Sequence, residues 1–252
     1  MSRRAPWLPA ALLLVGSAGA LGAQEVDLEK AAAVNAELAI TYMKQGNLRA
    51  AREKIDRALE QNPRTADTQM VAGFIYDRLG EDKKAASHYE QAVKLAGKNN
   101  PDVLNNAAVF LCRKGDKKRG EGYFLQAAAS PLYGTPEVAF TNAGRCARDD
   151  GRPEDAERYF RQALALKPNL PDPLLQLAGI QQETGHGLQA RAFVQRYHEA
   201  APASSASLWL GYRIERDLGD RAAAEEYARR LKMEFPTSVE TGQLYDREQK
   251  AP

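Results

Sequence analysis

Hydrophobic and polar positions follow a helical period through almost the whole chain. The stretch 137–168, EVAFTNAGRCARDDGRPEDAERYFRQALALKP, shows this most clearly. Its apolar residues recur three and four positions apart on both sides of a polar turn at 150–152, which predicts two amphipathic helices. Small residues such as Ala143 and Gly144 mark a close approach of the two backbones, and Pro168 ends the second helix. Such a pair has one apolar face left over, so it is expected to stack on a copy of itself.

The rest of the chain supplies these copies. A turn glycine recurs at intervals of 34 to 36 residues, and a small residue follows each glycine by five positions. A 34-residue helix-turn-helix period with small, aromatic and proline positions is typical of tetratricopeptide repeats (TPRs). The sequence therefore predicts an all-α fold, a TPR superhelical solenoid of about six helix-turn-helix repeats with a C-terminal capping helix. The turn glycines are Gly46, Gly80, Gly115, Gly151, Gly185 and Gly219.

The predicted repeats divide residues 30–236 and leave two irregular places. A loop is expected at 131–136, between repeats three and four, because two prolines and a glycine there prevent a continuous helix. Residues 237–249 are amphipathic, and we expect them to form a capping helix that shields the last repeat. The six repeats are placed at about 32–64, 65–97, 101–130, 137–168, 171–202 and 205–236.

Residues 1–23 have the pattern of a secretory signal peptide. Arg3 and Arg4 precede a short apolar stretch that is followed by small residues; an ordinary buried first helix is the alternative. Gln24 stands where a lipoprotein signal would carry its cysteine, so no thioether-linked lipid is expected. We therefore expect an exported, periplasmic protein whose association with the outer membrane, if any, is peripheral and indirect.

The charge balance and the absence of catalytic motifs favour a binding protein over an enzyme. The chain has 35 basic and 33 acidic side chains, and the excess comes from the two N-terminal arginines, so nothing indicates a nucleic-acid partner. His88, His186 and His198 lie in different repeats without cysteine or carboxylate at metal-ligand spacing. No phosphate-binding loop or nucleophile motif occurs. We expect no catalysis, no cofactor, no metal and no small-molecule substrate.

The candidate working surface is the concave face, lined by the first helix of each repeat. In repeats one and two this face is mainly apolar with two flexible methionines, which suits an amphipathic or extended peptide. In repeats three and four it is polar and basic. The alternative is that these residues only close the packing between repeats. The predicted partner-binding residues are Ile40, Met43, Met70, Phe74 and Arg78, then Asn105, Val109, Arg113, Thr141, Arg145 and Arg148.

The two cysteines, Cys112 and Cys146, lie late in the first helices of repeats three and four, 34 residues apart. Because these helices pack side by side, the thiols could meet, and an even cysteine count in an exported chain favours a disulfide. Their positions within the repeats differ by two residues, which weakens that interpretation. Two separate buried thiols, packed as small hydrophobic groups, are the alternative.

Several stretches resemble one family more specifically than the TPR pattern does. They are LNNAAVFLCRKG at 104–115, FLQAAASPLYGT at 124–135, PEVAFTNAGRC at 136–146 and SLWLGYRIERDLG at 207–219. The chain resembles the type IV pilus biogenesis/stability family (PilF/PilW), the pilotins, over about residues 30–236.

The resemblance implies six TPRs and a role in bringing the pilus secretin to the outer membrane and helping it multimerise. The implied partner is an outer-membrane secretin subunit, and the cysteine pair fits the family pattern. Members are typically outer-membrane lipoproteins. This chain departs from that pattern, because Gln24 stands in the place of the lipid-bearing cysteine. A general periplasmic TPR adaptor that scaffolds other envelope-assembly or cell-wall proteins is the alternative function.

Overall fold

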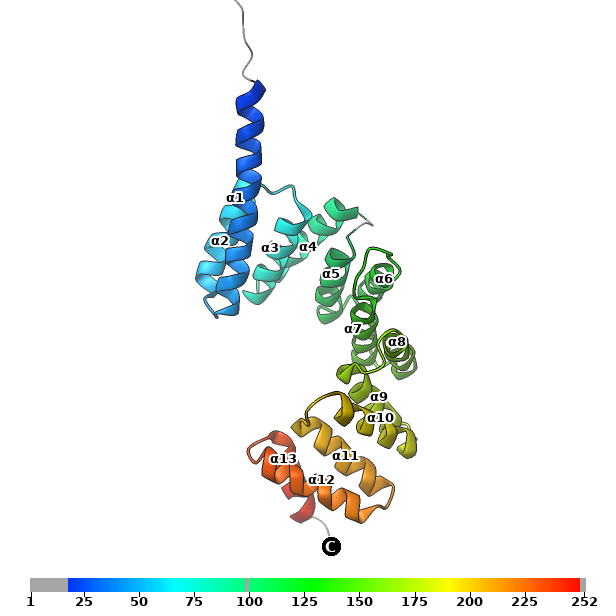
Figure 1. The fold of residues 1–252 in the computed structure, drawn as a ribbon. Helices are drawn as coiled ribbons and strands as arrows, with labels where there is room; N and C mark the ends of the chain where they lie inside the picture. The colour runs from blue at the N-terminus through cyan, green and yellow to red at the C-terminus, as the bar shows by residue number, and fades with distance from the viewer. Residues whose placement is uncertain (1–17, 98–99, 250–252) are drawn as a thin grey trace, which may run out of the picture. The chain divides into compact units, whose positions relative to one another are not determined.

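The computed structural model describes residues 18–97 and 100–249, and within these ranges it contains helices and no strand (Figure 1). Residues 1–17 of the predicted signal peptide lie outside the described residues, and the side chains of 18–27 are likewise not described. None of the described helices is both long and apolar enough to cross a membrane.

The chain forms two compact units that divide after Leu95. We call the first helix of each repeat the A helix and the second the B helix. Unit 1 contains α1 (Ala18–Lys44), α2 (Leu48–Gln61), α3 (Ala66–Arg78) and nearly all of α4 (Asp82–Ala96). Unit 2 contains α5 (Pro101–Arg113), α6 (Lys117–Ala128), α7 (Pro136–Asp149), α8 (Pro153–Leu166), α9 (Pro171–Glu183), α10 (Gly187–Ala200), α11 (Ser205–Asp217), α12 (Arg221–Glu234) and α13 (Val239–Gln249).

The turn glycines end each A helix in a conformation that other residues adopt only with strain. All six have positive φ, for example 72° at Gly151, and no other residue type does so in the described ranges. This left-handed conformation lets the chain reverse direction and start the B helix within a few residues. Asn47 then caps α2 by accepting a hydrogen bond from the Ala50 backbone N–H at 3.1 Å.

In unit 1 the small positions predicted from the repeat pattern are buried. Ala39, Ala51 and Ala72 are fully buried, and a Cβ added to Gly73 would lie 2.9 Å from the Tyr89 ring. Small residues at these positions therefore let the two helices of a pair pack closely, with the Tyr89 ring of α4 against the backbone of Gly73 in α3. The predicted small-residue pattern is confirmed as the packing pattern of the helix pairs.

Unit 2 repeats this packing with closer contacts. A Cβ added to Gly144 would lie 2.6 Å from the Phe160 ring, and one added to Gly211 would lie 2.5 Å from the Tyr227 ring. A buried hydrophobic cluster runs from α5 to α11. At the C-terminal end, Leu244 of α13 is fully buried against the last repeat. The helix α13 thus covers apolar surface that the last repeat would otherwise expose.

The segment between α6 and α7 is a loop, as the prolines in it predicted. Leu132 at its tip is 71% exposed, whereas Tyr133 is buried. Burial raises the pKa of the Tyr133 hydroxyl. The buried Tyr133 ring therefore anchors the loop, and the adjacent Leu132 side chain faces solvent.

Cys112 of α5 and Cys146 of α7 form a disulfide with a Cα–Cα distance of 5.7 Å. They lie three and five positions before the turn glycines Gly115 and Gly151. A Cβ added to Gly120 of α6 would lie only 2.5 Å from the Cys112 sulfur. The bridge therefore depends on a glycine at the close approach of α6, and it joins the A helices of two successive repeats.

Candidate partner-binding face

One repeat position characterises the face formed by the A helices, which we call the A-helix face. It lies six residues before each turn glycine, so the same slot can be compared in all six repeats. The slot is apolar in the first three repeats and then holds arginine, glycine and arginine. Its residues are Ile40, Phe74, Val109, Arg145, Gly179 and Arg213.

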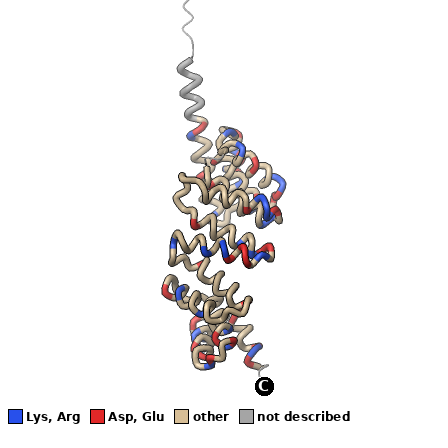
Figure 2. Tube along the Cα trace, turned by 90° about the vertical axis from the view of Figure 1, so that its right-hand side faces the viewer, with Lys and Arg blue, Asp and Glu red and all other residues tan. Residues whose placement is uncertain are grey.

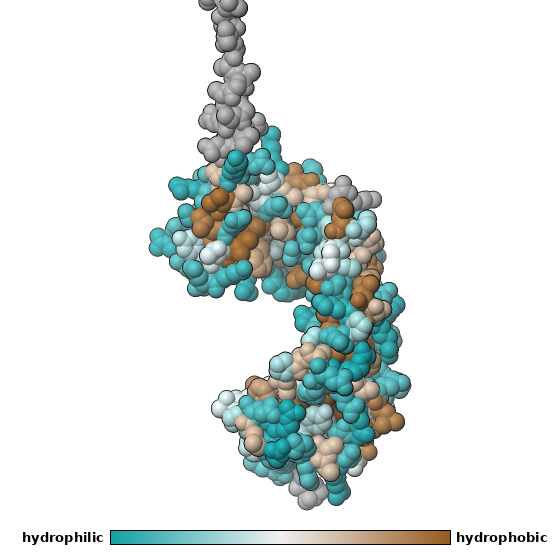
Figure 3. Space-filling model, in the orientation of Figure 1, coloured by the Kyte–Doolittle hydropathy of each residue, from teal (hydrophilic) through white to brown (hydrophobic). Residues whose placement is uncertain are grey.

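In unit 1 the A-helix face is apolar and partly exposed. Phe74 of α3 is 39% exposed, and Ile40 in the same slot of α1 is half-buried. Figure 3 shows apolar surface over α1 and beside α3. The other predicted partner-binding residues of this unit lie on the same two helices: Met43 and Met70 are half-buried, and Arg78 is exposed.

In the first two repeats of unit 2 the same face is mostly engaged within the chain. Asn105 is buried, and its side-chain oxygen accepts a hydrogen bond from Asn142 at 3.1 Å. The hydroxyl of Thr141 donates to the Glu137 carbonyl at 2.7 Å. Val109 is 43% exposed, and Arg113 is also exposed. Asn105 and Thr141 therefore bond within the unit, whereas Val109 presents apolar surface.

The two predicted arginines of α7 bridge to the next A helix. Arg145 forms an ion pair with Asp172 at 2.8 Å. Arg148 donates to Gln176 at 2.5 Å and to Glu183 at 2.7 Å. These contacts match the alternative in which the residues close the packing between repeats. Exposed pairs of this kind stabilise only weakly, but they neutralise the basic character predicted for this part of the face.

Sequence reasoning missed a hollow part of the A-helix face farther along unit 2, around Trp209 and Arg213 of α11. Both side chains line a space that also reaches Gly179 of α9 and Gln243 of α13. The signal in the sequence was an aromatic residue in a repeat position usually held by a smaller one. That signal is ambiguous, because terminal repeats are commonly atypical.

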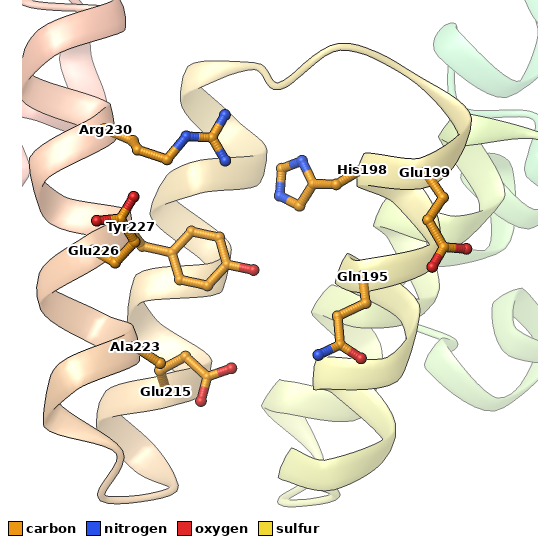
Figure 4. Close-up of a pocket in the computed structure, with 8 residues that line it drawn as sticks. All are labelled: Gln195, His198, Glu199, Glu215, Ala223, Glu226, Tyr227 and Arg230. Atoms are coloured by element: carbon orange, nitrogen blue, oxygen red, sulfur yellow. The ribbon is translucent and has the colours of Figure 1, made fainter.

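Another pocket of about 510 Å³ lies in unit 2, between α10 and α12. Figure 4 shows His198 of α10 and Tyr227 and Arg230 of α12 pointing toward one another across it. Burial lowers the pKa of His198, and its buried Nε2 atom has no hydrogen-bond partner. Glu215 is held by Arg191, whose Nε donates to it at 2.9 Å. The pocket is thus lined by a buried imidazole and by a carboxylate that an arginine already holds.

Charge and metal-ligand chemistry give no further candidate among the described residues. Figure 2 shows basic and acidic residues interspersed along the described trace of both units. In the same residues no group of three or more histidine, cysteine, aspartate or glutamate side chains could hold a metal ion. The A-helix face is therefore the candidate site that we develop below.

Comparison with known proteins places the chain in a family. Models of the tetratricopeptide repeat match residues 36–102 and 147–210. The crystal structure of PilW, described as a widely conserved type IV pilus biogenesis factor, is 30% identical with a TM-score of 0.77, and the match covers 85% of this chain and 98% of that one. The chain belongs to the PilF/PilW family of type IV pilus biogenesis proteins.

The similarity to PilF extends over most of both proteins. The type IV pilus assembly protein PilF of Pseudomonas aeruginosa is 29% identical over 206 residues, which are 81% of each chain. The solved structure of Pseudomonas aeruginosa PilF gives a TM-score of 0.75 at 26% identity and covers 88% of this chain and 99% of that one. The predicted resemblance to PilF/PilW and the predicted all-α TPR solenoid are therefore confirmed. TPR proteins of this kind are protein-interaction scaffolds, which directs attention to the A-helix face.

Proposed function

We propose that this protein is a pilotin-like factor of type IV pilus biogenesis that binds the outer-membrane secretin subunit and supports its localisation and multimerisation. Two findings support the proposal: membership of the PilF/PilW family and the exposed apolar A-helix face of unit 1. The observation that carries the binding role is Phe74, because a large aromatic side chain 39% exposed on a face with other apolar residues is typical of a partner site.

The mechanism is stoichiometric binding without a chemical step. Ile40, Met43, Met70 and Phe74 are the apolar contacts that a secretin segment would cover. Methionine side chains adapt to differently shaped partners, and an amphipathic or extended segment can present apolar residues to α1 and α3. Moving a fully exposed side chain of this kind out of water is worth about 1.5–3 kcal/mol, and covering the part that these residues still expose contributes less. Arg78, exposed at the end of α3, is placed to meet an acidic group beside the apolar contacts.

The proposed location is the periplasm, with peripheral association at the outer membrane through a partner. The disulfide between Cys112 and Cys146 supports an exported location, because disulfides persist in oxidising compartments and are rare in reducing ones. Mass spectrometry of the protein purified without reductant tests this point. Two free thiols would contradict the bridge.

Affinity capture of the mature protein from envelope extract tests the partner. We expect the secretin subunit to co-elute, and a deletion strain to lose secretin multimers and pili. Capture of cell-wall or other envelope enzymes without secretin, together with normal piliation of the deletion strain, would contradict the proposal and favour the general periplasmic adaptor.

A further inference from the structure

Two adjoining hollows of about 280 and 390 Å³ lie on the A-helix face of unit 2. Trp209 and Arg213 of α11 and Gln243 of α13 line both of them. The smaller hollow extends over Gly179 of α9 to Arg148 of α7. We call the two hollows together the Trp209 groove. It lies within unit 2 and shares no residue with the apolar face of unit 1.

One repeat slot that lines the groove carries no side chain. Gly179 occupies the slot that holds a side chain in the other repeats, and it lies in mid-helix without a positive φ, so the backbone does not require glycine there. A glycine in a helix interior is destabilising relative to alanine. A Cβ at this position would lie 3.2 Å from the Arg148 guanidinium. The absent side chain therefore makes room for the Arg148 guanidinium over Gly179, and the hollow beside it has Leu175 and Leu210 among its walls.

Arg213 is an arginine without an anion. Its counterpart in the same slot of an earlier repeat, Arg145, pairs at 2.8 Å with Asp172, the second residue of the following A helix. Glu240 is the second residue of α13, which packs on α11 in the place of a next A helix, and it lines the same hollow. Arg213 nevertheless forms no ion pair with Glu240 or with any other described residue. The Nε atom of Arg213 is also buried without an acceptor. Because that atom has no exposed surface, a ligand would meet the guanidinium through its terminal nitrogens.

The chemistry around Arg213 selects a carboxylate beside an apolar group. A planar guanidinium binds a carboxylate through two parallel hydrogen bonds. The half-buried Trp209 ring, which stacks on Tyr212 at a centroid distance of 5.3 Å and has the Arg247 guanidinium 5.7 Å from its centroid, lines the same groove. We propose that the Trp209 groove binds an internal segment of a partner polypeptide in which an acidic side chain adjoins a large apolar one. The carboxylate pairs with Arg213, and the apolar side chain lies against Leu175 and Leu210 in the smaller hollow.

The segment is assigned as internal because the groove continues on both sides of Trp209. One hollow leads toward Gly179 and Arg148, and the other leads toward Asp246 and Arg247 of α13. A bound chain can therefore extend in both directions, whereas a terminal carboxylate needs only one open side. This site goes beyond the proposed secretin contact in unit 1, and each of the two proposals is tested independently of the other.

The test is peptide titration of the whole mature protein, followed by NMR through the Arg213 Nε–H and the Trp209 indole N–H signals. The probe is a peptide with both ends blocked in which aspartate alternates with leucine and phenylalanine. We expect saturable shifts of both signals, and about tenfold weaker binding when asparagine replaces aspartate. A second peptide with asparagine in place of aspartate and a free C-terminal carboxylate distinguishes a terminal from an internal anion.

Matched variants separate binding from folding. Arg213→Gln removes a group that forms no ion pair, so we expect an unchanged unfolding temperature and equal affinities for the aspartate and asparagine peptides. Arg216→Gln, on the same helix but outside the groove, is the control and should keep the tenfold difference. Phe74→Glu should also keep the tenfold difference. Loss of the proposed secretin contact in unit 1 is thereby distinguished from loss of binding at the Trp209 groove.

Three results would overturn the proposal. One is equal affinity of the unmodified protein for the aspartate and asparagine peptides. Another is an Arg213 Nε–H signal that does not move at saturation. The third is tighter binding of the neutral peptide with a free C-terminus than of the blocked acidic peptide.

Discussion

Phe74 in unit 1 and Arg145 in unit 2 occupy the same slot of their repeats, yet the chain uses them differently. Phe74 is 39% exposed and lies among other apolar residues, whereas Arg145 pairs with Asp172 of the next repeat. The helix-turn-helix scaffold fixes where the slot points, and the residue in it decides whether the face is free for a partner or joins neighbouring repeats. Function thus belongs to particular slots rather than to the TPR fold as a whole.

The two units also differ in how their helices are held together. Unit 2 has the disulfide between Cys112 and Cys146. Unit 1 connects its two repeats through an ion pair between Arg52 and Glu81 at 2.8 Å. A covalent link limits the freedom of the unfolded chain, whereas a partly exposed ion pair contributes little. We therefore expect the stability of unit 2 to depend on redox conditions and that of unit 1 to be independent of them.

The largest predicted effect comes from removing the bridge. Changing Cys112→Ser together with Cys146→Ser should destabilise unit 2 by about 3–4 kcal/mol, because the bridge closes a loop of 34 residues. Trp209 is the only tryptophan after residue 23, so its fluorescence during urea unfolding reports on unit 2. Reductant should reproduce the effect in the unmodified protein. An unchanged urea midpoint in both experiments would contradict the account.

The next effect compares close helix contacts in the two units. Gly144→Ala should destabilise unit 2 by about 1–3 kcal/mol, and Gly73→Ala should cost less in unit 1. The reason is that the added Cβ lies 2.6 Å from the Phe160 ring in the first case and 2.9 Å from the Tyr89 ring in the second. Thermal unfolding followed by circular dichroism measures both.

Gly122→Ala on α6 is the control for this series, because its Cβ meets nothing within 4 Å. It should stabilise the protein by up to about 1 kcal/mol through helix propensity. Equal effects at all three glycines would show that helix propensity, rather than packing against the aromatic ring, determines the result.

A smaller effect concerns acid in unit 1. Burial lowers the pKa of His88, with Lys84 contributing in the same direction and Asp56 opposing. Because the unfolded imidazole takes up a proton near pH 6.5 and the folded one resists it, stability should fall as pH drops below about 6.5. The loss should stay below about 1.4 kcal/mol per pH unit.

The comparison of His88→Gln with the unmodified protein in urea at pH 7.5 and pH 5.5 isolates this effect. The variant should lose less stability between the two pH values. The remaining pH dependence includes His198 of unit 2, whose pKa is also lowered by burial. An identical pH dependence of the His88→Gln variant and the unmodified protein would show that His88 does not cause the loss of stability in acid.

The smallest effect tests the paired arginine. Arg145→Gln should destabilise unit 2 by about 0.2–1 kcal/mol, because the pair with Asp172 is partly exposed and screened by salt. A double-mutant cycle with Asp172→Asn, measured at low and high salt, isolates the pairwise contribution. A coupling energy of zero at low salt would show that Arg145 is available to a partner after all.

The helical repeat could be predicted from the sequence because each of its elements is local. The turn glycines, the small packing positions and the proline-rich loop at 131–136 each follow from conformational limits on one or two residues. The burial of Asn105 against Asn142 could not be predicted, since it depends on how two A helices are inclined to each other. The same holds for the ion pair of Arg145 with Asp172.

The Trp209 groove was missed for a different physical reason. Sequence patterns register the residues of single helices, whereas this hollow is lined by residues of α7, α9, α11 and α13 together. Its recognition also requires knowing that Arg213 has no ion pair, although Glu240 stands at the position where the earlier repeat supplies Asp172. Only the packing of α9, α11 and α13 shows that combination.

The most direct test of the central claim is calorimetric titration of the purified secretin subunit into the protein with Phe74→Glu, and into a control with Leu188→Glu. Leu188 is 69% exposed on the B helix α10, so a charged side chain at this position stays in contact with water. If the A-helix face of unit 1 holds the partner, Phe74→Glu should weaken binding at least about tenfold, which corresponds to about 1.4 kcal/mol, and the control should bind normally. Unchanged binding by Phe74→Glu, or equal weakening by both variants, would contradict the claim.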